Sequence, residues 1–274
     1  MIATLAQVLT PCVSGGTAVA GLVVLGWEDA RAYVMAAEAE GRPVMLQAGP
    51  GCRAHIPLPV LGAMFRVLAM GATVPVVAHL DHGESLEVCR QAVDCGFTLV
   101  MYDGLALPLA ENIARTRQVV AMAHACGVQV EAELEFVGHH GGARSLGTNP
   151  EEVTGFWAAT AVDALAVSVG NTHLMQGTGA KVDWRHLRAI QAAAPALPLV
   201  LHGGSGLAPE VRHRLARETS VCKFNIGTER RMAFGAALRR AVAADPAQFD
   251  RNQILADTIP AMVTAARSAI GSMG

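Results

Sequence analysis

The chain has 274 residues, of which 52% are hydrophobic, 16% charged and 4% aromatic, and its formal net charge is −2. This length buries a sizeable core without disulfides, and the dispersed lysines and arginines argue against a nucleic-acid partner. Apolar runs are broken by glycine, proline or charge before about 18 residues, which argues against a membrane span. The six cysteines form no CxxC pair, and no basic segment precedes the first apolar residues, so we expect a cytoplasmic protein without a signal peptide.

Short apolar segments alternate along the chain with longer segments of helical period. The predicted strands are Thr17–Val24, Pro43–Gln47, Val74–His79, Thr98–Tyr102, Val128–Leu134, Ala164–Val169, Leu197–His202 and Val221–Asn225. The predicted helices are Trp27–Glu40, Leu58–Met70, Ser85–Cys95, Leu107–Cys126, Glu151–Ala161, Asp183–Ala194, Pro209–Glu218 and Thr228–Ala243, with a further helix over Asn252–Ile270. Eight strand–helix units predict an α/β fold, a (β/α)8 TIM barrel with an extra C-terminal helix, and no linker divides residues 1–274, so we expect a single domain.

The third predicted strand ends in a polar cluster, His79–His82, directly after an apolar run. Unpaired polar atoms out of water cost roughly 2–7 kcal/mol, so two imidazoles and a carboxylate at this position indicate a bound metal or substrate. A polar turn with solvated histidines is the alternative for this stretch alone. Functional side chains of a parallel barrel gather at the carboxyl ends of its strands. His82, His173 and His202 lie at the ends of three such strands, and three imidazoles with an open fourth position are a catalytic zinc arrangement.

Two turns near the end of the predicted barrel offer a phosphate site. The turn Gly203-Gly204-Ser205-Gly206 lies between a strand and a helix, where backbone N–H groups and a helix N-terminus can hold a phosphate, although many such turns only reverse the chain. The next strand is followed by further N–H and hydroxyl donors, namely Asn225, Ile226, Gly227 and Thr228. Phosphates often lie between the last two strands of a barrel, so the two turns support each other.

The connection over residues 135–148 is longer than the usual βα connection of about 2–6 residues. It is rich in glycine and contains His139, His140 and Arg144. Glycines permit movement and these side chains offer chemistry, so the segment is interpreted as a functional lid rather than a disordered insertion.

The segments HLDH, YDG, VEAEL, GNTH, LHGGSG and KFNIGT, in this order, resemble those of the class II (zinc-dependent) ketose-bisphosphate aldolases, which include fructose- and tagatose-bisphosphate aldolases. The resemblance covers nearly the whole chain, from Thr17 to the end of the eighth predicted helix. It implies a lyase that reversibly cleaves a phosphorylated ketose to dihydroxyacetone phosphate and an aldehyde through a metal-stabilised enediolate. It also favours a homodimer or homotetramer.

The same resemblance implies roles for individual residues. Zn²⁺, or another divalent ion, would be held by His82, His173 and His202, with Glu133 as a second-shell residue or alternate ligand. Asp81 would transfer the proton at the C4 hydroxyl. The dihydroxyacetone phosphate portion would be bound by Gly203, Gly204, Ser205, Asn225, Ile226, Gly227 and Thr228, and a monovalent cation would lie beside its phosphate.

Several positions depart from the family's pattern. Leu174 stands where a glycine usually contributes to the phosphate and monovalent-cation site, and Leu105 stands where a serine is usual. The lid has no acid between Gly138 and Thr148, so a lid histidine is a candidate for the base at C3. These changes leave the metal ligands and Asp81 in place and open the alternative of a different ketose or a ketose monophosphate.

Three further alternatives stay open at this level. A metal-assisted hydrolase also uses a histidine-rich barrel mouth, although its usual His-x-His on the first strand is missing from Thr17–Val24. A catalytically silent paralogue would retain the metal site for binding or regulation. A class I aldolase would use Lys223 for a Schiff base. The apolar face of the predicted terminal helix, with Ile254, Leu255, Ile259, Met262 and Val263, either serves a subunit interface or packs across the barrel.

Overall fold

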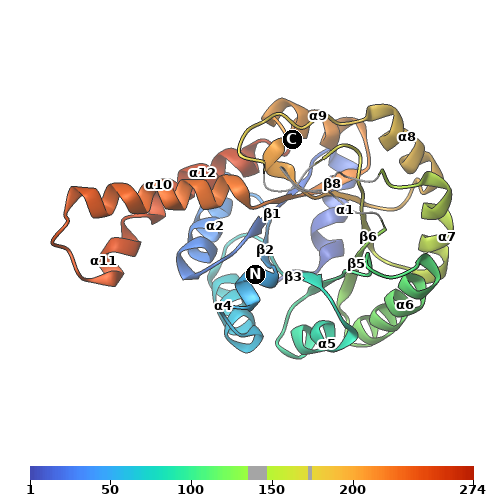
Figure 1. Cartoon of the computed structure of the whole chain (residues 1–274), viewed down its shortest axis with the longest axis horizontal. Helices are drawn as coiled ribbons and strands as arrows, with labels where there is room; N and C mark the ends of the chain where they lie inside the picture. The colour runs from blue at the N-terminus through green and yellow to red at the C-terminus, as the bar shows by residue number, and fades with distance from the viewer. Residues whose placement is uncertain (135–146, 172–174) are drawn as a thin grey trace.

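The structure, a computed structural model, describes residues 1–134, 147–171 and 175–274. Within these residues eight parallel strands, each hydrogen-bonded to the next, close into a barrel (Figure 1). The strands are β1 (Val19–Val23), β2 (Val44–Ala48), β3 (Val76–Gly83), β4 (Leu99–Tyr102), β5 (Gln129–Glu133), β6 (Ala164–Ala166), β7 (Leu199–Leu201) and β8 (Val221–Ile226). The predicted (β/α)8 barrel is therefore confirmed.

Helices surround the barrel because each strand is followed by a segment that buries one apolar stripe against it. They are α2 (Trp27–Glu40), α4 (Leu58–Gly71), α5 (Leu86–Asp94), α6 (Leu109–Ala125), α7 (Pro150–Thr160), α8 (Trp184–Ala193), α9 (Pro209–Glu218) and α10 (Thr228–Ala244). A short helix that was not predicted from the sequence, α3 (Pro50–Arg53), follows β2.

None of the described helices is both long enough and apolar enough to span a membrane. Of the six cysteines, four are buried, whereas Cys95 is half-buried and Cys126 exposed.

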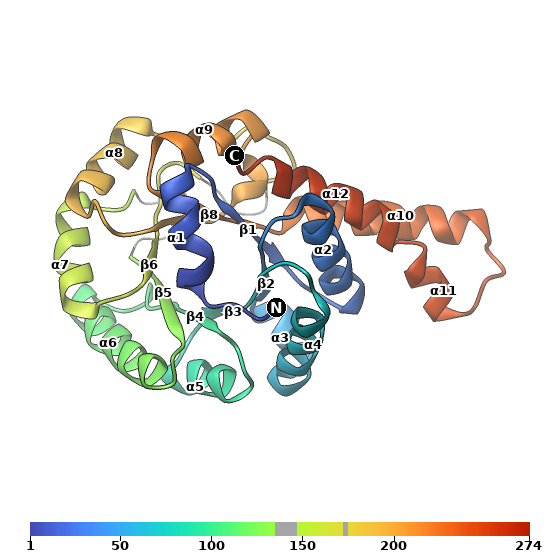
Figure 2. The same cartoon turned by 180° about the vertical axis from the view of Figure 1, so that it is seen from behind.

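A second unpredicted helix, α1 (Leu5–Gly15), closes one end of the barrel. It begins with a capping box, in which the Thr4 side chain accepts from the Gln7 N–H and the Gln7 side chain accepts from the Thr4 N–H. One face of α1 is buried in a core cluster that includes residues of all the strands except β5. The buried residues of α1 are Leu5, Val8, Leu9 and Cys12. Figure 2 shows α1 lying across the barrel. The opposite end is left for the site.

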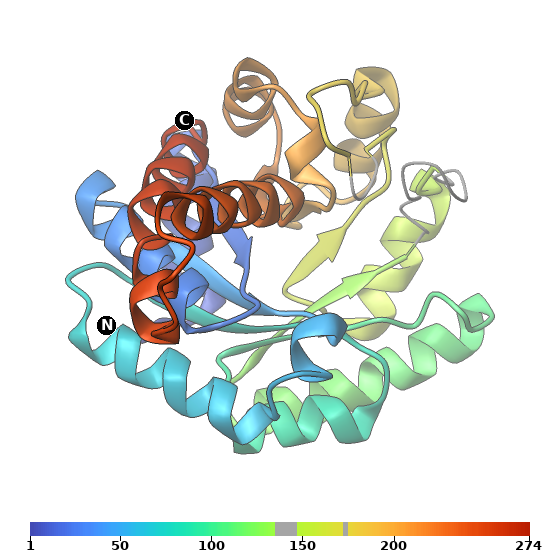
Figure 3. The ribbon, with the colours of Figure 1, turned by 60° about the vertical axis from the view of Figure 1, so that its left-hand side comes forward.

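The prediction of one terminal helix over Asn252–Ile270 is wrong, because the chain forms two helices, α11 (Arg251–Ala256) and α12 (Ile259–Gly271). Pro260 has no N–H and cannot continue the α11 hydrogen-bond ladder, so a new helix begins there. Figures 1 and 3 show α10 and α11 projecting from the barrel as an arm, whereas α12 runs back along α2. Ile259 and Met262 are buried, so this apolar face is covered largely within the chain and no longer argues for a partner subunit.

The barrel interior changes from apolar to polar toward the site. Side chains two residues apart in a strand point to the same face, so the inward-facing residues form successive layers along the barrel axis. The middle layer is fully buried and polar, and it contains Gln47, His79, Glu131 and Lys223. Two residues further along three of these strands come the residues of the mouth, Asp81, Glu133 and Asn225.

One glycine permits a close helix contact that can be tested. A Cβ atom added to Gly62 of α4 would lie 2.2 Å from the carbonyl oxygen of Cys95, just after α5. Gly62→Ala is expected to lower the free energy of unfolding by about 1–3 kcal/mol, because α4 must shift to accommodate the methyl group. Urea denaturation measures this loss. Gly71→Ala in the same helix, where nothing lies within 4 Å, is the control, and equal stability of the two variants would contradict the prediction.

Candidate active site

A cavity of about 380 Å³ opens at the carboxyl ends of the strands, and this volume suits a small organic substrate. Its walls come from the ends of several strands and from α3. The polar and charged lining residues are Asp81, His82, Asp103, Glu133, Ser205, Asn225, Thr228 and Arg231. The apolar and glycine positions are Val23, Leu25, Gly49, Pro50, Gly51, Cys52, Leu105, Gly203 and Gly227.

Asp81 and His82 both face this cavity although they are neighbours in β3. Successive residues of a regular strand point to opposite faces, so one of them would be expected to point away. The register of β3 against β4 shifts between Leu80 and Gly83, and His82 has φ +51°. A non-glycine residue with positive φ is uncommon and carries strain, which often occurs at functional sites. This local distortion brings both side chains into the mouth.

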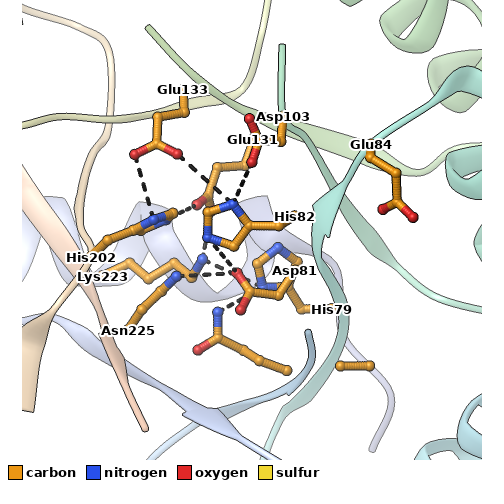
Figure 4. A network of polar contacts seen from close by, with 12 residues as sticks. His79, Asp81, His82, Glu84, Asp103, Glu131, Glu133, His202, Lys223 and Asn225 are labelled. Atoms are coloured by element: carbon orange, nitrogen blue, oxygen red, sulfur yellow. Dashed lines mark hydrogen bonds and ion pairs between the residues drawn. The ribbon is translucent and has the colours of Figure 1, made fainter. Parts of the chain in front are cut away.

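The imidazoles of His82 and His202 lie together with carboxylates around one point, as Figure 4 shows. His82 Nδ1 lies 2.8 Å from Asp103 Oδ2 and 3.9 Å from Glu133 Oε2, and His202 Nδ1 lies 3.7 Å from Glu133 Oε1. The potential ligand atoms of Asp81, His82 and His202 lie within 4.8 Å of one another, as do those of His82, Asp103 and Glu133. Imidazole and carboxylate ligands at this spacing fit a divalent metal such as zinc.

The electrostatics of the cluster favour a bound cation. Burial lowers the pKa of His82, but Asp81, Asp103 and Glu133 raise it more, and the result is a pKa of about 10. Burial raises the pKa of Glu133 to about 7, against the lowering effect of His202 and His82. Both carboxylate oxygens of Glu133 are buried without a hydrogen-bond partner among the described residues. Such orphaned oxygens are costly, and a metal ion would satisfy them.

A second network below the mouth orients His202. Glu131 Oε1 lies 3.2 Å from His202 Nε2, and its other oxygen accepts from Lys223 Nζ at 2.6 Å. Burial raises the pKa of Glu131, but Lys223 and His202 hold it below its usual range, so it is a carboxylate and takes the His202 Nε2–H. The other ring nitrogen, Nδ1, then faces Glu133 and the metal position.

Lys223 is therefore part of the support of the site rather than a nucleophile. It is fully buried, paired with Glu131 and 3.4 Å from His79 Nδ1, which also lies 3.1 Å from Gln47 Nε2. Burial and Lys223 lower the pKa of His79 to about 3, so this imidazole is neutral. A Schiff-base lysine must be neutral and reach the substrate. The class I alternative is disfavoured.

Asp81 lies on the wall of the cavity between His82 and Asn225. Its Oδ1 is 4.0 Å from His82 Nε2 and accepts from Asn225 Nδ2 at 3.4 Å. Burial raises the pKa of Asp81, but His82 and His79 outweigh this and hold it below its usual value. The side chain is thus a carboxylate that faces the cavity, which is the state of a general base.

The glycine-rich turn lies beside this cluster. Gly203 has φ +66°, and Gly204–Gly206 form a single 3-10 turn, η1. A Cβ atom on Gly204 would meet the Asn225 carbonyl oxygen at 2.9 Å, so the turn can pack against β8 only with glycine there. Ser205 Oγ accepts from the Glu229 N–H at 3.3 Å, which leaves its O–H to donate elsewhere.

The predicted phosphate residues are distributed unevenly around the cavity. Gly203, Ser205, Asn225, Gly227 and Thr228 line it, whereas Gly204 and Ile226 do not. The Ile226 side chain is fully buried in the core, so only its backbone remains available to a ligand.

Buried Arg212 braces the turn, because its Nε donates to the Gly204 carbonyl oxygen at 3.1 Å and its guanidinium pairs with Glu229.

Some predicted residues lie outside the described part of the chain, and other residues of the site were not predicted. His173, Leu174 and the lid candidates His139, His140 and Arg144 fall on residues 172–174 and 135–146. Asp103 directly follows a predicted strand, which was a usable signal, but no role was predicted for it. Lys223 was considered only as a nucleophile. Arg231 lines the cavity from the first turn of α10, three residues after Thr228, and no role was predicted for it.

Comparison with known proteins gives consistent matches. The family model "Fructose-bisphosphate aldolase class-II" matches residues 3–274. A fructose-bisphosphate aldolase of Geobacillus stearothermophilus is 35% identical over 283 residues, covering 100% of this chain and 98% of that protein. A 6-phospho-5-dehydro-2-deoxy-D-gluconate aldolase of Shouchella clausii is 38% identical over 251 residues, covering 88% and 83%. The crystal structure of the YdjI aldolase from Escherichia coli K12 superposes with a TM-score of 0.85 at 27% identity, covering 100% and 98%.

Proposed function

Since the chain belongs to the class II fructose-bisphosphate aldolase family, whose members are metal-dependent lyases of phosphorylated sugars, we propose that it reversibly cleaves a phosphorylated ketose to dihydroxyacetone phosphate and an aldehyde. One observation carries this proposal. A histidine–carboxylate cluster, an ionised aspartate and a glycine–serine turn surround one cavity. Metal-dependent cleavage of a ketose phosphate needs a metal site, a proton acceptor and a phosphate site, and the cluster, the aspartate and the turn are the groups that we propose for these three roles.

The proposed metal is Zn²⁺ or another divalent ion, held by His82, His173 and His202, with Glu133 as a second-shell residue or alternate ligand. The bound ion would polarise the ketone and stabilise the negative charge that develops on the enediolate. Glu131 and Asp103 keep the two described imidazoles oriented toward it. A monovalent cation beside the donor phosphate is also proposed.

Asp81 is the proposed proton acceptor in the cleavage direction. Its carboxylate takes the proton of the C4 hydroxyl as the C3–C4 bond breaks, and it returns that proton in the direction of synthesis. Asn225 holds one Asp81 oxygen, which fixes the carboxylate relative to the substrate. The proton at C3 is assigned to a histidine of the lid, for which His139 and His140 are the candidates, and Arg144 is the third candidate residue of the lid.

The phosphate of the dihydroxyacetone portion is proposed to lie at the Gly203–Gly206 turn and the start of α10. N–H groups of the turn and of the first helical turn, the Ser205 hydroxyl and the Thr228 hydroxyl are the donors available there. Arg212 supports this arrangement through the Gly204 carbonyl oxygen.

One arginine lies beside the proposed phosphate position. Arg231 is the one arginine or lysine among the described lining residues of the cavity, whose wall also includes apolar Val23, Leu25 and Leu105. A Cβ atom on Gly227 would lie 3.7 Å from Arg231 Nη2, so this guanidinium lies at the start of α10. Arg231→Met is expected to raise KM about tenfold for a ketose 1-phosphate and for a ketose bisphosphate, because a charge-assisted hydrogen bond to the phosphate that both substrates share is lost. A raised KM for the bisphosphate alone would contradict this and assign Arg231 to the second phosphate.

One experiment tests the proposed function as a whole. Metal analysis of the purified protein is combined with a coupled assay of dihydroxyacetone phosphate release across a panel of ketose mono- and bisphosphates. Release that EDTA abolishes and Zn²⁺ restores is expected. A protein that holds metal but cleaves no member of the panel would instead be the silent paralogue.

The assembly proposed for this chain is a homodimer or homotetramer in the cytoplasm, built from one domain. The arm formed by α10 and α11 supports it, because Met232, Val242 and Phe249 on this arm are exposed apolar residues. Analytical ultracentrifugation of the full chain measures the mass, and a monomer at micromolar concentration would exclude the assembly.

A further inference from the structure

We propose that Arg53 is a positioning residue that holds the end of β3 in the distorted conformation on which the metal site depends. The inference extends the metal-binding part of the proposed function. No step of the proposed mechanism uses the Arg53 side chain. The Arg53 side chain is only 9% exposed, although α3, which carries it, forms the rim of the cavity.

The contacts of Arg53 are mainly with backbone oxygens. Its Nη1 donates to the carbonyl oxygens of Ala48 at 2.9 Å and Asp81 at 2.7 Å, and its Nη2 donates to that of His82 at 2.9 Å. Nη2 also meets the Glu84 carboxylate at 2.7 Å. One planar guanidinium thus joins the ends of β2 and β3 across two consecutive peptide groups of β3.

These two carbonyl groups belong to the residues that form the site. The peptide plane ties the direction of each carbonyl to that of the following N–H, so holding the Asp81 and His82 oxygens fixes the backbone on both sides of His82. His82 has φ +51° there, a strained conformation that persists only where its surroundings enforce it. Without the guanidinium, β3 can relax toward a regular strand, in which Asp81 and His82 point to opposite faces.

The backbone conformation of His82 determines whether the potential metal ligands lie close together. The ligand atoms of Asp81, His82 and His202 stay within 4.8 Å of one another only while His82 faces the mouth. The Arg53–Glu84 pair contributes little, because the Glu84 side chain is 66% exposed. The role of Arg53 therefore lies in its carbonyl contacts, and this separates it from an ordinary surface ion pair.

The test measures metal binding directly in the full chain. Zn²⁺ is titrated in competition with a chromophoric chelator, and the visible spectrum of the Co²⁺-loaded protein reports the ligand geometry. Arg53→Met is expected to raise the dissociation constant for Zn²⁺ about 10- to 100-fold, as loss of groups that orient metal ligands does, and to change the Co²⁺ spectrum. Arg53→Lys should also lose affinity, because a single ammonium cannot span the three carbonyl groups. Glu84→Gln, the matched control, should bind Zn²⁺ as the unaltered protein does.

Several outcomes would overturn the proposal. They are wild-type affinity in Arg53→Met, wild-type affinity in Arg53→Lys, or an equal loss in Glu84→Gln. The titration is made on folded protein below its unfolding temperature, so a general loss of stability does not imitate the effect. It also needs no sugar. If the unaltered protein binds Zn²⁺, Arg53→Met binds it weakly and no ketose is cleaved, the proposed activity fails while this inference stands. An unaltered protein that binds no divalent metal would overturn both.

Discussion

Asp81→Asn is expected to lower kcat for ketose cleavage by roughly 10²- to 10⁴-fold, the range that a positioned general base contributes. The amide has nearly the shape of the carboxylate, so it fits beside Asn225 and His82 without new steric strain. It cannot accept the proton of the C4 hydroxyl at neutral pH. KM should change much less than kcat, because the proposed phosphate contacts lie at the Gly203–Gly206 turn and not at Asp81.

The measurement is a single-turnover assay of dihydroxyacetone phosphate release together with metal analysis of the same sample. Metal content must stay at the level of the unaltered protein, since Asp81 also lies in a group of potential ligands. Asp94→Asn, an exposed position on α5, is the control for purification and folding. An Asp81→Asn variant that retains both its metal and its turnover would remove Asp81 from the proton transfer.

The sequence was sufficient to predict those parts of the site that depend on where a strand ends and on the alternation of side chains between the two faces of a strand. Glu131 and Glu133, two residues apart, share the inward face of β5, and His202 is the last residue of the predicted seventh strand. The joint placement of Asp81 and His82 could not be predicted in this way. A regular strand separates neighbours, and the distortion that brings them together is held by Arg53, which is 28 and 29 residues away in the chain.

The two wrong helix predictions have a different origin, because the residues that mark these helices are close together in the sequence. The residues Thr4 and Gln7 form a capping box before an apolar pattern with helical spacing, yet α1 was not predicted. Pro260 likewise marks the start of α12. Contacts across the closed barrel leave no such local trace. Lys223 and Glu131 are 92 residues apart, and only the pairing of all the strands places one against the other.

Substitutions in the buried pair Lys223–Glu131 are expected to have the second large effect, on stability and on metal affinity. Lys223→Met leaves the Glu131 carboxylate fully buried without its cation, and breaking a buried pair from one side costs about 3–5 kcal/mol of unfolding free energy. Glu131→Gln has a second consequence, because the amide can no longer serve as the charged acceptor for the His202 Nε2–H. The affinity for Zn²⁺ should then fall about 10- to 100-fold.

The double variant Lys223→Met/Glu131→Gln separates the two roles. Its unfolding free energy in urea should exceed that of Lys223→Met alone, because the uncompensated buried charge has gone, and the pair should show strong coupling in the double-mutant cycle. Its Zn²⁺ affinity should stay as low as that of Glu131→Gln, because His202 still lacks its carboxylate. Recovery of stability without recovery of metal affinity is thus the expected signature of a pair in which Lys223 neutralises Glu131 and Glu131 orients His202. If metal affinity recovered with stability, Glu131 would have no orienting role, and the ring of His202 would be held by packing alone.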